Sequence, residues 1–144
     1  MIKTGHWARQ YKFDKEVHQK MTGFDSTNFD IEITSVDNNN FIGKVQDDLT
    51  TGGTEGVGEI VGKIRGEKIA FVKQMPILTV MVDKNGTRKT FNKRHKKIYY
   101  SGTFSSDRIT IIGTWKFKFG FIWLGLIPIP VLPTYGTWTM KFKD

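Results

Sequence analysis

The sequence predicts an all-β fold: an up-and-down antiparallel β-barrel of about 8–10 strands with a long apolar hairpin tip, formed by a single domain over residues 1–144. Three observations lead to this prediction. Apolar and polar side chains alternate along much of the chain, with the two-residue period of a strand. Turn signals separate these short segments, and helical periodicity is nearly absent. Because the turns are local, consecutive strands are expected to pair, and closure of the sheet removes its exposed edges.

The first half of the chain is expected to form five strands, over residues 7–13, 29–34, 41–45, 56–65 and 68–75. Asparagine and aspartate tolerate left-handed backbone, so Asp37-Asn38-Asn39-Asn40 predicts a turn between the second strand and the third. Arg65-Gly66-Glu67 closes the next hairpin, and the glycines near it permit the sharp coiling of a barrel. Between the first two strands, Val17 and Met21 stand four residues apart and indicate a short helical turn over residues 14–21.

The second half adds a hairpin and three longer strands. Asn85-Gly86, between residues 80–82 and 87–89, is a strong short-range hairpin signal. Strands are expected over residues 98–104, 109–119 and 135–143. In this register twelve aromatic side chains share the interior, namely Trp7, Tyr11, Phe13, Phe29, Phe41, Phe71, Tyr100, Phe104, Trp115, Phe117, Trp138 and Phe142. An eight-stranded barrel is just wide enough to be filled by side chains or to hold one small ligand. Inward glycines take up little space, so the sequence is compatible with a filled interior and with a cavity for a small ligand.

The net charge of +8 is concentrated in one segment. Residues 83–97 hold seven cations and one carboxylate, which places six of the eight net charges there. The basic patch expected from this segment comprises Arg88, Lys89, Lys93, Arg94, Lys96 and Lys97. Such a patch attracts anions by steering and does not define the fold. With aromatic residues beside it, the patch also fits nucleic-acid binding, but we favour a solvated loop with flanking strand cations and expect no nucleic-acid partner.

Composition removes several kinds of chemistry. The absence of cysteine excludes disulfides, thiolate metal sites and a cysteine nucleophile. His6, His18 and His95 lack a partner at a metal-ligand spacing, and no nucleotide-binding or nucleophile motif occurs. We therefore predict no catalytic residue, metal or cofactor, and a barrel enzyme with paired carboxylates is the weakest hypothesis. No secretory signal is visible, which fits a cytoplasmic protein, although an exported form whose leader has been removed fits as well.

The tripeptide Gly-x-Trp occurs three times, as Gly5-His6-Trp7, Gly113-Thr114-Trp115 and Gly136-Thr137-Trp138. The first copy stands at the head of the first predicted strand, and the later copies repeat the rhythm begun by Tyr100-Ser101-Gly102. In these features the chain resembles the calycin superfamily of lipocalins, fatty-acid-binding proteins and avidins. The resemblance implies a barrel that is closed at one end by the first tryptophan and that binds a small apolar ligand. The chain departs from lipocalins in lacking their disulfide, and from avidins in lacking their polar biotin loop.

A ligand inside the barrel would contact inward aromatic and charged side chains. The candidate ligand-binding residues are Arg9, Tyr11, Lys73, Tyr100, Trp115 and Trp138. Arg9 and Lys73 share the inward register, where a charge needs a partner. Either Arg9 stacks on the barrel-closing tryptophan and donates to carbonyls, or Arg9 or Lys73 receives a ligand's carboxylate. Because a mostly apolar cavity with a few polar groups is typical of binding sites, our first hypothesis is a non-enzymatic binding protein for a small apolar or amphipathic ligand.

An uncharged segment near the end of the chain is not explained by the barrel. Between Lys118 and Lys141 there are 22 residues without a charge, and three prolines among them oppose a membrane-spanning helix. We expect an apolar hairpin that covers the barrel mouth, packs in a homo-oligomer or contacts an anionic membrane surface. The alternative hypothesis is therefore an interaction protein that docks through residues 119–133. The candidate residues are Phe119, Phe121, Ile122, Trp123, Leu124, Leu126, Ile127, Ile129, Val131 and Leu132.

Overall fold

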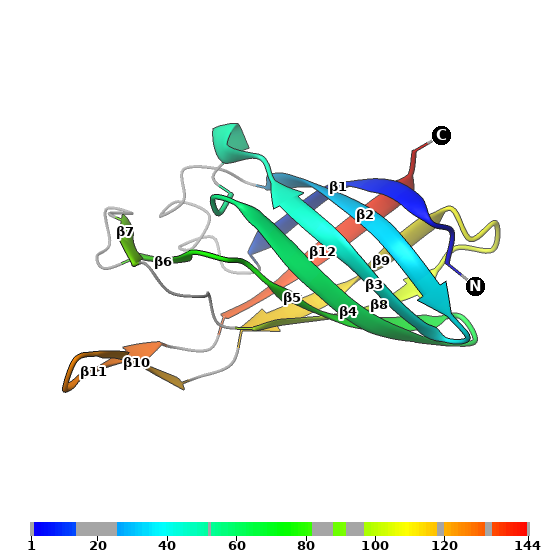
Figure 1. Cartoon of the computed structure of the whole chain (residues 1–144). Helices are drawn as coiled ribbons and strands as arrows, with labels where there is room; N and C mark the ends of the chain where they lie inside the picture. The colour runs from blue at the N-terminus through cyan, green and yellow to red at the C-terminus, as the bar shows by residue number, and fades with distance from the viewer. Residues whose placement is uncertain are drawn as a thin grey trace.

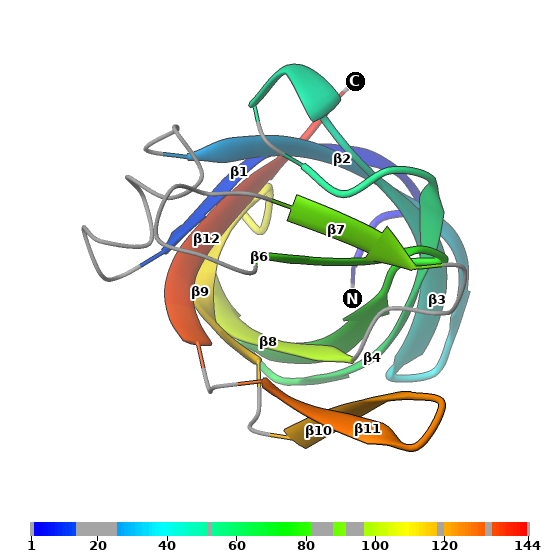
Figure 2. The ribbon, with the colours of Figure 1, turned by 90° about the vertical axis from the view of Figure 1, so that its left-hand side faces the viewer.

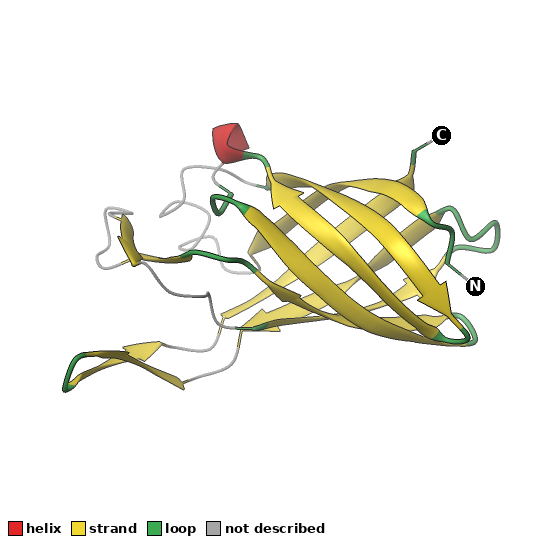
Figure 3. Ribbon diagram, viewed as in Figure 1, coloured by secondary structure: helices red, strands yellow, loops and turns green. Residues whose placement is uncertain are grey.

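A computed structural model describes residues 2–13, 26–51, 53–81, 88–91, 97–117, 120–131 and 134–143. Eight strands close into an antiparallel barrel in the order β1-β12-β9-β8-β5-β4-β3-β2 (Figure 1). Their bounds are β1 Gly5–Phe13, β2 Thr27–Asp37, β3 Asn40–Asp47, β4 Val57–Arg65, β5 Lys68–Gln74, β8 Ile98–Phe104, β9 Thr110–Phe117 and β12 Thr134–Phe142. Consecutive strands pair around the barrel, so the predicted all-β, up-and-down barrel is confirmed. The described helix is a single short 3-10 turn, η1, at Leu49–Thr51 (Figure 3).

The two ends of the barrel differ in the connections they carry. Tight turns join β2 to β3, β4 to β5 and β8 to β9 at one end, where the chain termini also lie (Figure 1). The first two turns use left-handed backbone, at Asn38 with φ 54° and at Gly66 with φ 58°, as the turn chemistry of these residues predicts. The opposite end carries η1 and two small hairpins. We call these the closed end and the loop end.

Two hairpins stand outside the barrel, and both were expected from the sequence. β6 (Leu78–Met81) pairs with β7 (Arg88–Phe91), and β10 (Gly120–Leu124) pairs with β11 (Ile127–Val131). The predicted turn at Asn85-Gly86 and the predicted helical turn over residues 14–21 lie outside the described residues. Seen along the barrel axis, β6–β7 crosses the opening of the loop end, whereas β10–β11 lies outside the outline of the barrel (Figure 2). From the side, β10–β11 extends beyond the loop end (Figure 1).

Aromatic side chains fill the interior. All twelve rings predicted to point inward are buried or pack against the buried core, as predicted. Phe71 lies in the middle of one cluster: its ring stacks on Tyr100 with centroids 4.7 Å apart and meets Trp138 nearly edge to face at 5.3 Å. Such arrangements are the favoured geometries of aromatic pairs.

Inward glycines make room for these rings. A Cβ atom at Gly62 would lie 2.4 Å from Phe41 Cζ, and one at Gly136 would lie 2.3 Å from Trp115 Nε1. A real side chain does not tolerate contacts this short, so each glycine is required by the ring beside it. The space that side chains at Gly62 and Gly136 would take up is occupied by the rings of Phe41 and Trp115.

The closed end is sealed by apolar packing and by cations over two of its rings. One of these cations is Lys3, whose Nζ lies 5.0 Å from the centroid of Phe142. Trp7 is fully buried, and its indole Nε1 donates a hydrogen bond to the Lys3 carbonyl at 3.0 Å. The Arg108 guanidinium lies 4.2 Å from the centroid of the Phe104 ring and donates to the Gly66 carbonyl at 3.3 Å. Stacking on a ring and donating to a carbonyl was one of the two roles expected for Arg9, and here Arg108 fulfils it.

Candidate functional site

A buried ion pair lies inside the barrel near its loop end. The Lys73 ammonium in β5 donates to Asp47 Oδ1, at the last residue of β3, over 2.6 Å. The two side chains are 2% and 1% exposed. Because β4 separates these strands, the pair spans the inner face of three adjacent strands. A charge stranded in apolar surroundings is costly, and here each charge has its counter-charge.

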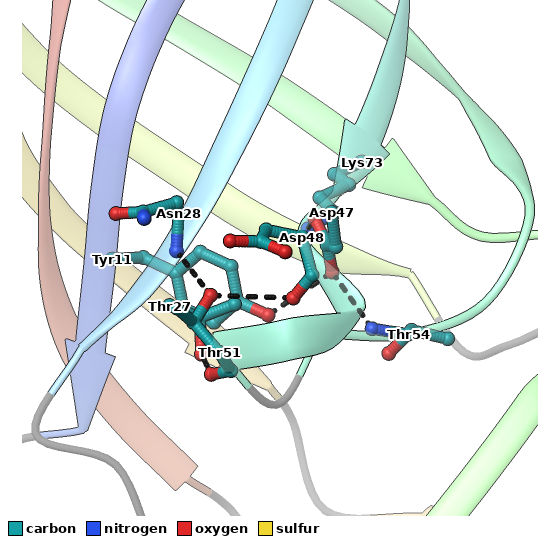
Figure 4. Close-up of polar contacts among 8 residues, drawn as sticks. All are labelled: Tyr11, Thr27, Asn28, Asp47, Asp48, Thr51, Thr54 and Lys73. Carbon is teal, nitrogen blue, oxygen red and sulfur yellow. Dashed lines mark hydrogen bonds and ion pairs between the residues drawn. The ribbon is translucent and has the colours of Figure 1, made fainter.

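Two further donors satisfy the second oxygen of Asp47. Tyr11 Oη donates to Asp47 Oδ2 at 3.0 Å, and the backbone amide of Thr54 donates to the same oxygen at 3.2 Å (Figure 4). The Tyr11 ring also faces the cation, because Lys73 Nζ lies 4.7 Å from its centroid. Burial, and then the Asp47 carboxylate, raises the pKa of Tyr11 well above its usual value. The phenol therefore stays protonated and acts as a hydrogen-bond donor.

Tyr100, in β8, packs against Phe71 and Trp138 and lies near enough to Asp47 for its charge to act on the phenol. Burial and the nearby charge of Asp47 raise the pKa of Tyr100 well above its ordinary value, so this phenol also stays neutral. We call Tyr11, Asp47, Lys73 and Tyr100 the mouth site. It combines one buried charge pair with two neutral phenols at the end of the barrel that carries the long connections.

The chain that follows β3 is held against β2 by hydrogen bonds. Thr27 Oγ1 donates to the Thr51 carbonyl at 2.9 Å, and the Asn28 amide donates to Thr51 Oγ1 at 2.9 Å (Figure 4). Asp48 accepts from both the amide and the hydroxyl of Thr50, and these bonds lower the pKa of Asp48. Because η1 is anchored in this way, the nearby amide that binds Asp47 is also positioned.

The structure brings together five of the six candidate ligand-binding residues. Tyr11, Lys73 and Tyr100 belong to the mouth site itself. The Trp115 ring lies 6.1 Å from the Tyr11 ring, and the Trp138 ring lies 5.6 Å from the Tyr100 ring, between centroids. The two indoles thus pack directly against the phenols that flank the ion pair.

Arg9 is the exception. Its ladder partners Phe29 and Met140 are both buried, yet the Arg9 side chain is exposed. The expectation that Arg9 is an interior cation is therefore wrong. The buried carboxylate is already paired with a lysine, and a guanidinium without a buried counter-charge is more stable in water. Arg9 lines an open depression of about 690 Å³, together with the exposed residues Lys141 and Lys143.

Asp47 is the residue of the mouth site that the sequence pattern did not single out. A signal for it exists, because Phe41, Gly43 and Val45 alternate on the inward face and the same period places Asp47 next on that face. A carboxylate in an inward register predicts a buried cation nearby. The partner of Asp47 is Lys73, which is 26 residues away in the chain, so the pair is identified only once the register of β3, β4 and β5 is known.

The apolar hairpin projects from the loop end. At its turn, Leu126 is 94% exposed and Ile127 is 65% exposed. The hairpin does not lie across the mouth in the axial view (Figure 2), so β10–β11 does not form a lid, which was one of the three roles considered for it. Phe121, Ile122, Trp123 and Leu124 belong to β10 and Ile129 and Val131 to β11, whereas Phe119 and Leu132 lie outside the described residues.

The expected basic patch is only partly visible. Lys97 is exposed, and Arg88 and Lys89 belong to β7 near the mouth. The remaining members, Lys93, Arg94 and Lys96, lie outside the described residues. Within the described ranges, no three His, Asp or Glu side chains gather closely enough to hold a metal ion.

Comparison of the chain with family models, with curated proteins and with solved structures found no match. The class of protein that the described geometry defines is therefore an architectural one, an eight-stranded closed antiparallel barrel with a buried ion pair at one end. In the part of the chain that the structure describes, no helix has the length and apolar character needed to cross a bilayer.

Proposed function

We propose that this protein is a non-enzymatic, calycin-like barrel that binds a small amphipathic molecule at its loop end. The observation that carries the proposal is the Asp47–Lys73 pair, which is buried among side chains that are mostly apolar. Replacing a buried ion pair by apolar residues is often neutral or stabilising, so folding alone gives little reason to keep one. A few polar groups in an otherwise apolar site are how proteins orient small ligands.

The chemistry of the mouth site favours a ligand with an apolar body and an anionic or hydrogen-bond-accepting head. An ammonium group has three donors, and Asp47 accepts one hydrogen bond from Lys73. The apolar body would contact Trp115 and Phe117, which are buried at the loop end. Because aromatic rings occupy the deeper barrel, the ligand would bind under β6–β7, which crosses the opening (Figure 2).

Two fluorescent probes that differ in charge test this proposal. 8-Anilinonaphthalene-1-sulfonate has an apolar body and an anionic head, and N-phenyl-1-naphthylamine has nearly the same body without the charge. We expect both probes to bind, the sulfonate more tightly because its oxygens can accept hydrogen bonds from the Lys73 ammonium. In the variant Lys73→Met/Asp47→Asn, which removes both charges and keeps an acceptor for Tyr11, we expect the preference for the sulfonate to fall by about tenfold.

The matched control is Leu126→Asp/Ile127→Asp, which changes exposed apolar side chains of the β10–β11 turn. This variant should bind both probes like the wild type, which distinguishes the mouth site from non-specific adsorption on the hairpin. The proposal fails if neither probe binds the wild-type protein. It also fails if the charge-free variant, shown to be folded by circular dichroism, keeps the full preference for the sulfonate.

A specific observation favours a second candidate function, docking through the apolar hairpin. The turn exposes Leu126 and Ile127 to solvent at a point that projects from the barrel (Figure 1). Exposed apolar groups in a contiguous patch are typical of surfaces that contact a membrane or another subunit. In that case Leu126→Asp/Ile127→Asp should abolish co-flotation with phosphatidylglycerol vesicles or dissociate an assembly. Unchanged behaviour in both assays would reject this function.

A further inference from the structure

We propose that the outer face of β3, β4 and β5 is an interface between two copies of this chain, centred on Val61. The proposal goes beyond ligand binding and does not depend on the mouth site. Val61 is 60% exposed and Ile42 is 50% exposed, and the two residues are direct partners in the β3–β4 ladder. A solvent-facing row of a sheet is ordinarily polar, so two adjacent exposed aliphatic side chains call for an explanation.

The apolar row continues across the neighbouring strands. Val61 pairs with Val72 in β5, and Val72 pairs with Tyr99 in β8. The exposed Ile42 and Val61 and the half-buried Val72 and Tyr99 therefore stand side by side on four adjacent strands, across about 14 Å at about 4.8 Å per strand. Scattered exposed apolar residues need no explanation, but a contiguous row is typical of an interaction surface.

Charges of opposite sign flank the centre of this row. Glu59 lies two residues before Val61 in β4 and Lys63 lies two residues after it, and both are exposed on the same face. Each is about 7 Å from Val61 along the strand. A two-fold axis along the row brings Val61 onto its own copy and places Glu59 of each molecule opposite Lys63 of the other. The same patch thereby serves both molecules, as a closed two-fold interface requires.

This complementarity identifies a second copy as the occupant. An anionic membrane would meet Glu59 and Glu32 along one edge of the row, where Glu32 and Glu59 both pair with Lys44 in the ladders. Lys44 and Lys63 balance these two carboxylates, so the face offers an anionic membrane no net attraction. The row and its two flanking rows span roughly 19 by 14 Å, or about 270 Å² on each copy, which is smaller than the interfaces of stable complexes. We therefore expect a weak, reversible dimer.

Sedimentation velocity over a wide range of protein concentrations tests the interface. The wild-type chain should shift from monomer to dimer as its concentration rises. Val61→Glu brings two carboxylates together on the axis and should raise the dimer Kd by about a hundredfold or more. Ile112→Glu is the matched control, because Ile112 is 63% exposed on β9 but lies outside the row, and this variant should dimerise like the wild type.

Charge exchange gives an independent readout. Glu59→Lys and Lys63→Glu each place like charges opposite one another across the interface, so each should weaken the dimer. The double variant Glu59→Lys/Lys63→Glu again places opposite charges face to face and should restore the wild-type dimer affinity. A wild-type chain that stays monomeric at its solubility limit would overturn the proposal. So would a dimer that Val61→Glu leaves intact. If Val61→Glu instead abolishes binding to phosphatidylglycerol vesicles without changing self-association, the face contacts lipid and the dimer interface is refuted.

Discussion

Removing the cation of the buried ion pair tests the electrostatics of the mouth site. Lys73→Met keeps an unbranched side chain of similar length and leaves Asp47, which is 1% exposed, without a counter-charge. Loss of one partner of a buried pair typically costs about 3–5 kcal/mol. We expect a decrease of that size in the free energy of unfolding, because the remaining partners of Asp47, the Tyr11 phenol and the Thr54 amide, are neutral.

The double variant Lys73→Met/Asp47→Asn separates charge pairing from packing. It buries no charge, and the asparagine oxygen still accepts hydrogen bonds from Tyr11 and Thr54. We expect its free energy of unfolding to lie within about 2 kcal/mol of the wild-type value, since uncharged replacements of buried pairs are often tolerated. The costs of the two single substitutions should therefore not add.

Urea unfolding followed by tryptophan fluorescence measures these free energies, because Trp115 and Trp138 are buried beside the site. A cost below about 1 kcal/mol for Lys73→Met, the value of a solvent-exposed pair, would refute the burial of the charge. A double variant as unstable as the sum of the two single variants would refute the coupling between them.

Three further predictions follow from the pKa shifts and from the packing. The raised pKa values of Tyr11 and Tyr100 mean that both phenols keep their protons in the folded state above the usual tyrosine pKa. Their contribution to stability is therefore present below about pH 10 and is lost as the pH rises. Urea unfolding at increasing pH should show the free energy of unfolding falling by up to about 1.4 kcal/mol per pH unit for each phenol. The hydrogen bond that the protonated His6 ring donates to Asp30 raises the pKa of His6. Its contribution to stability is therefore present below the unfolded pKa of about 6.5 and is lost as the pH rises through the raised value. An NMR titration should show that Asp30→Asn lowers the pKa of the imidazole. Gly62→Ala places a Cβ 2.4 Å from Phe41 Cζ and should lower the free energy of unfolding, measured by thermal unfolding, by about 3 kcal/mol. At Gly66 a Cβ meets nothing within 4 Å, so Gly66→Ala should lower it by only about 1 kcal/mol, because of the φ of +58°.

The alternation of side chains was enough to predict the barrel and its interior. The inward placement of Trp115, Trp138 and Lys73 depends only on the two-residue period of each strand, which is a local property of the sequence. Arg9 has the same local pattern and yet is exposed, because burial of a cation depends on a counter-charge that local pattern does not specify. Asp47 satisfies Lys73 across an intervening strand, and the distance between the two side chains is set by the pairing of β3 and β5 with β4.

The apolar hairpin shows a second limit of the sequence. The uncharged segment and the glycine at its turn, Gly125 with φ 64°, were enough to predict the two strands of the hairpin. The direction in which the hairpin projects depends on what its side chains contact. The two-residue period does not predict those contacts for a segment that lies outside the barrel wall. The outer apolar row was also invisible in the sequence, because it consists of single residues from separate strands that only the ladder aligns.

The central claim is that an amphipathic ligand binds at the loop end, beside Lys73. A ¹⁵N NMR titration with 8-anilinonaphthalene-1-sulfonate, followed on the indole N–H signals, measures this directly, because Trp115 packs near Tyr11 at the loop end and Trp7 seals the closed end. We expect a saturable shift of the Trp115 signal while the Trp7 signal stays in place. A Trp115 signal that does not move, or equal shifts at both ends of the barrel, would contradict the claim.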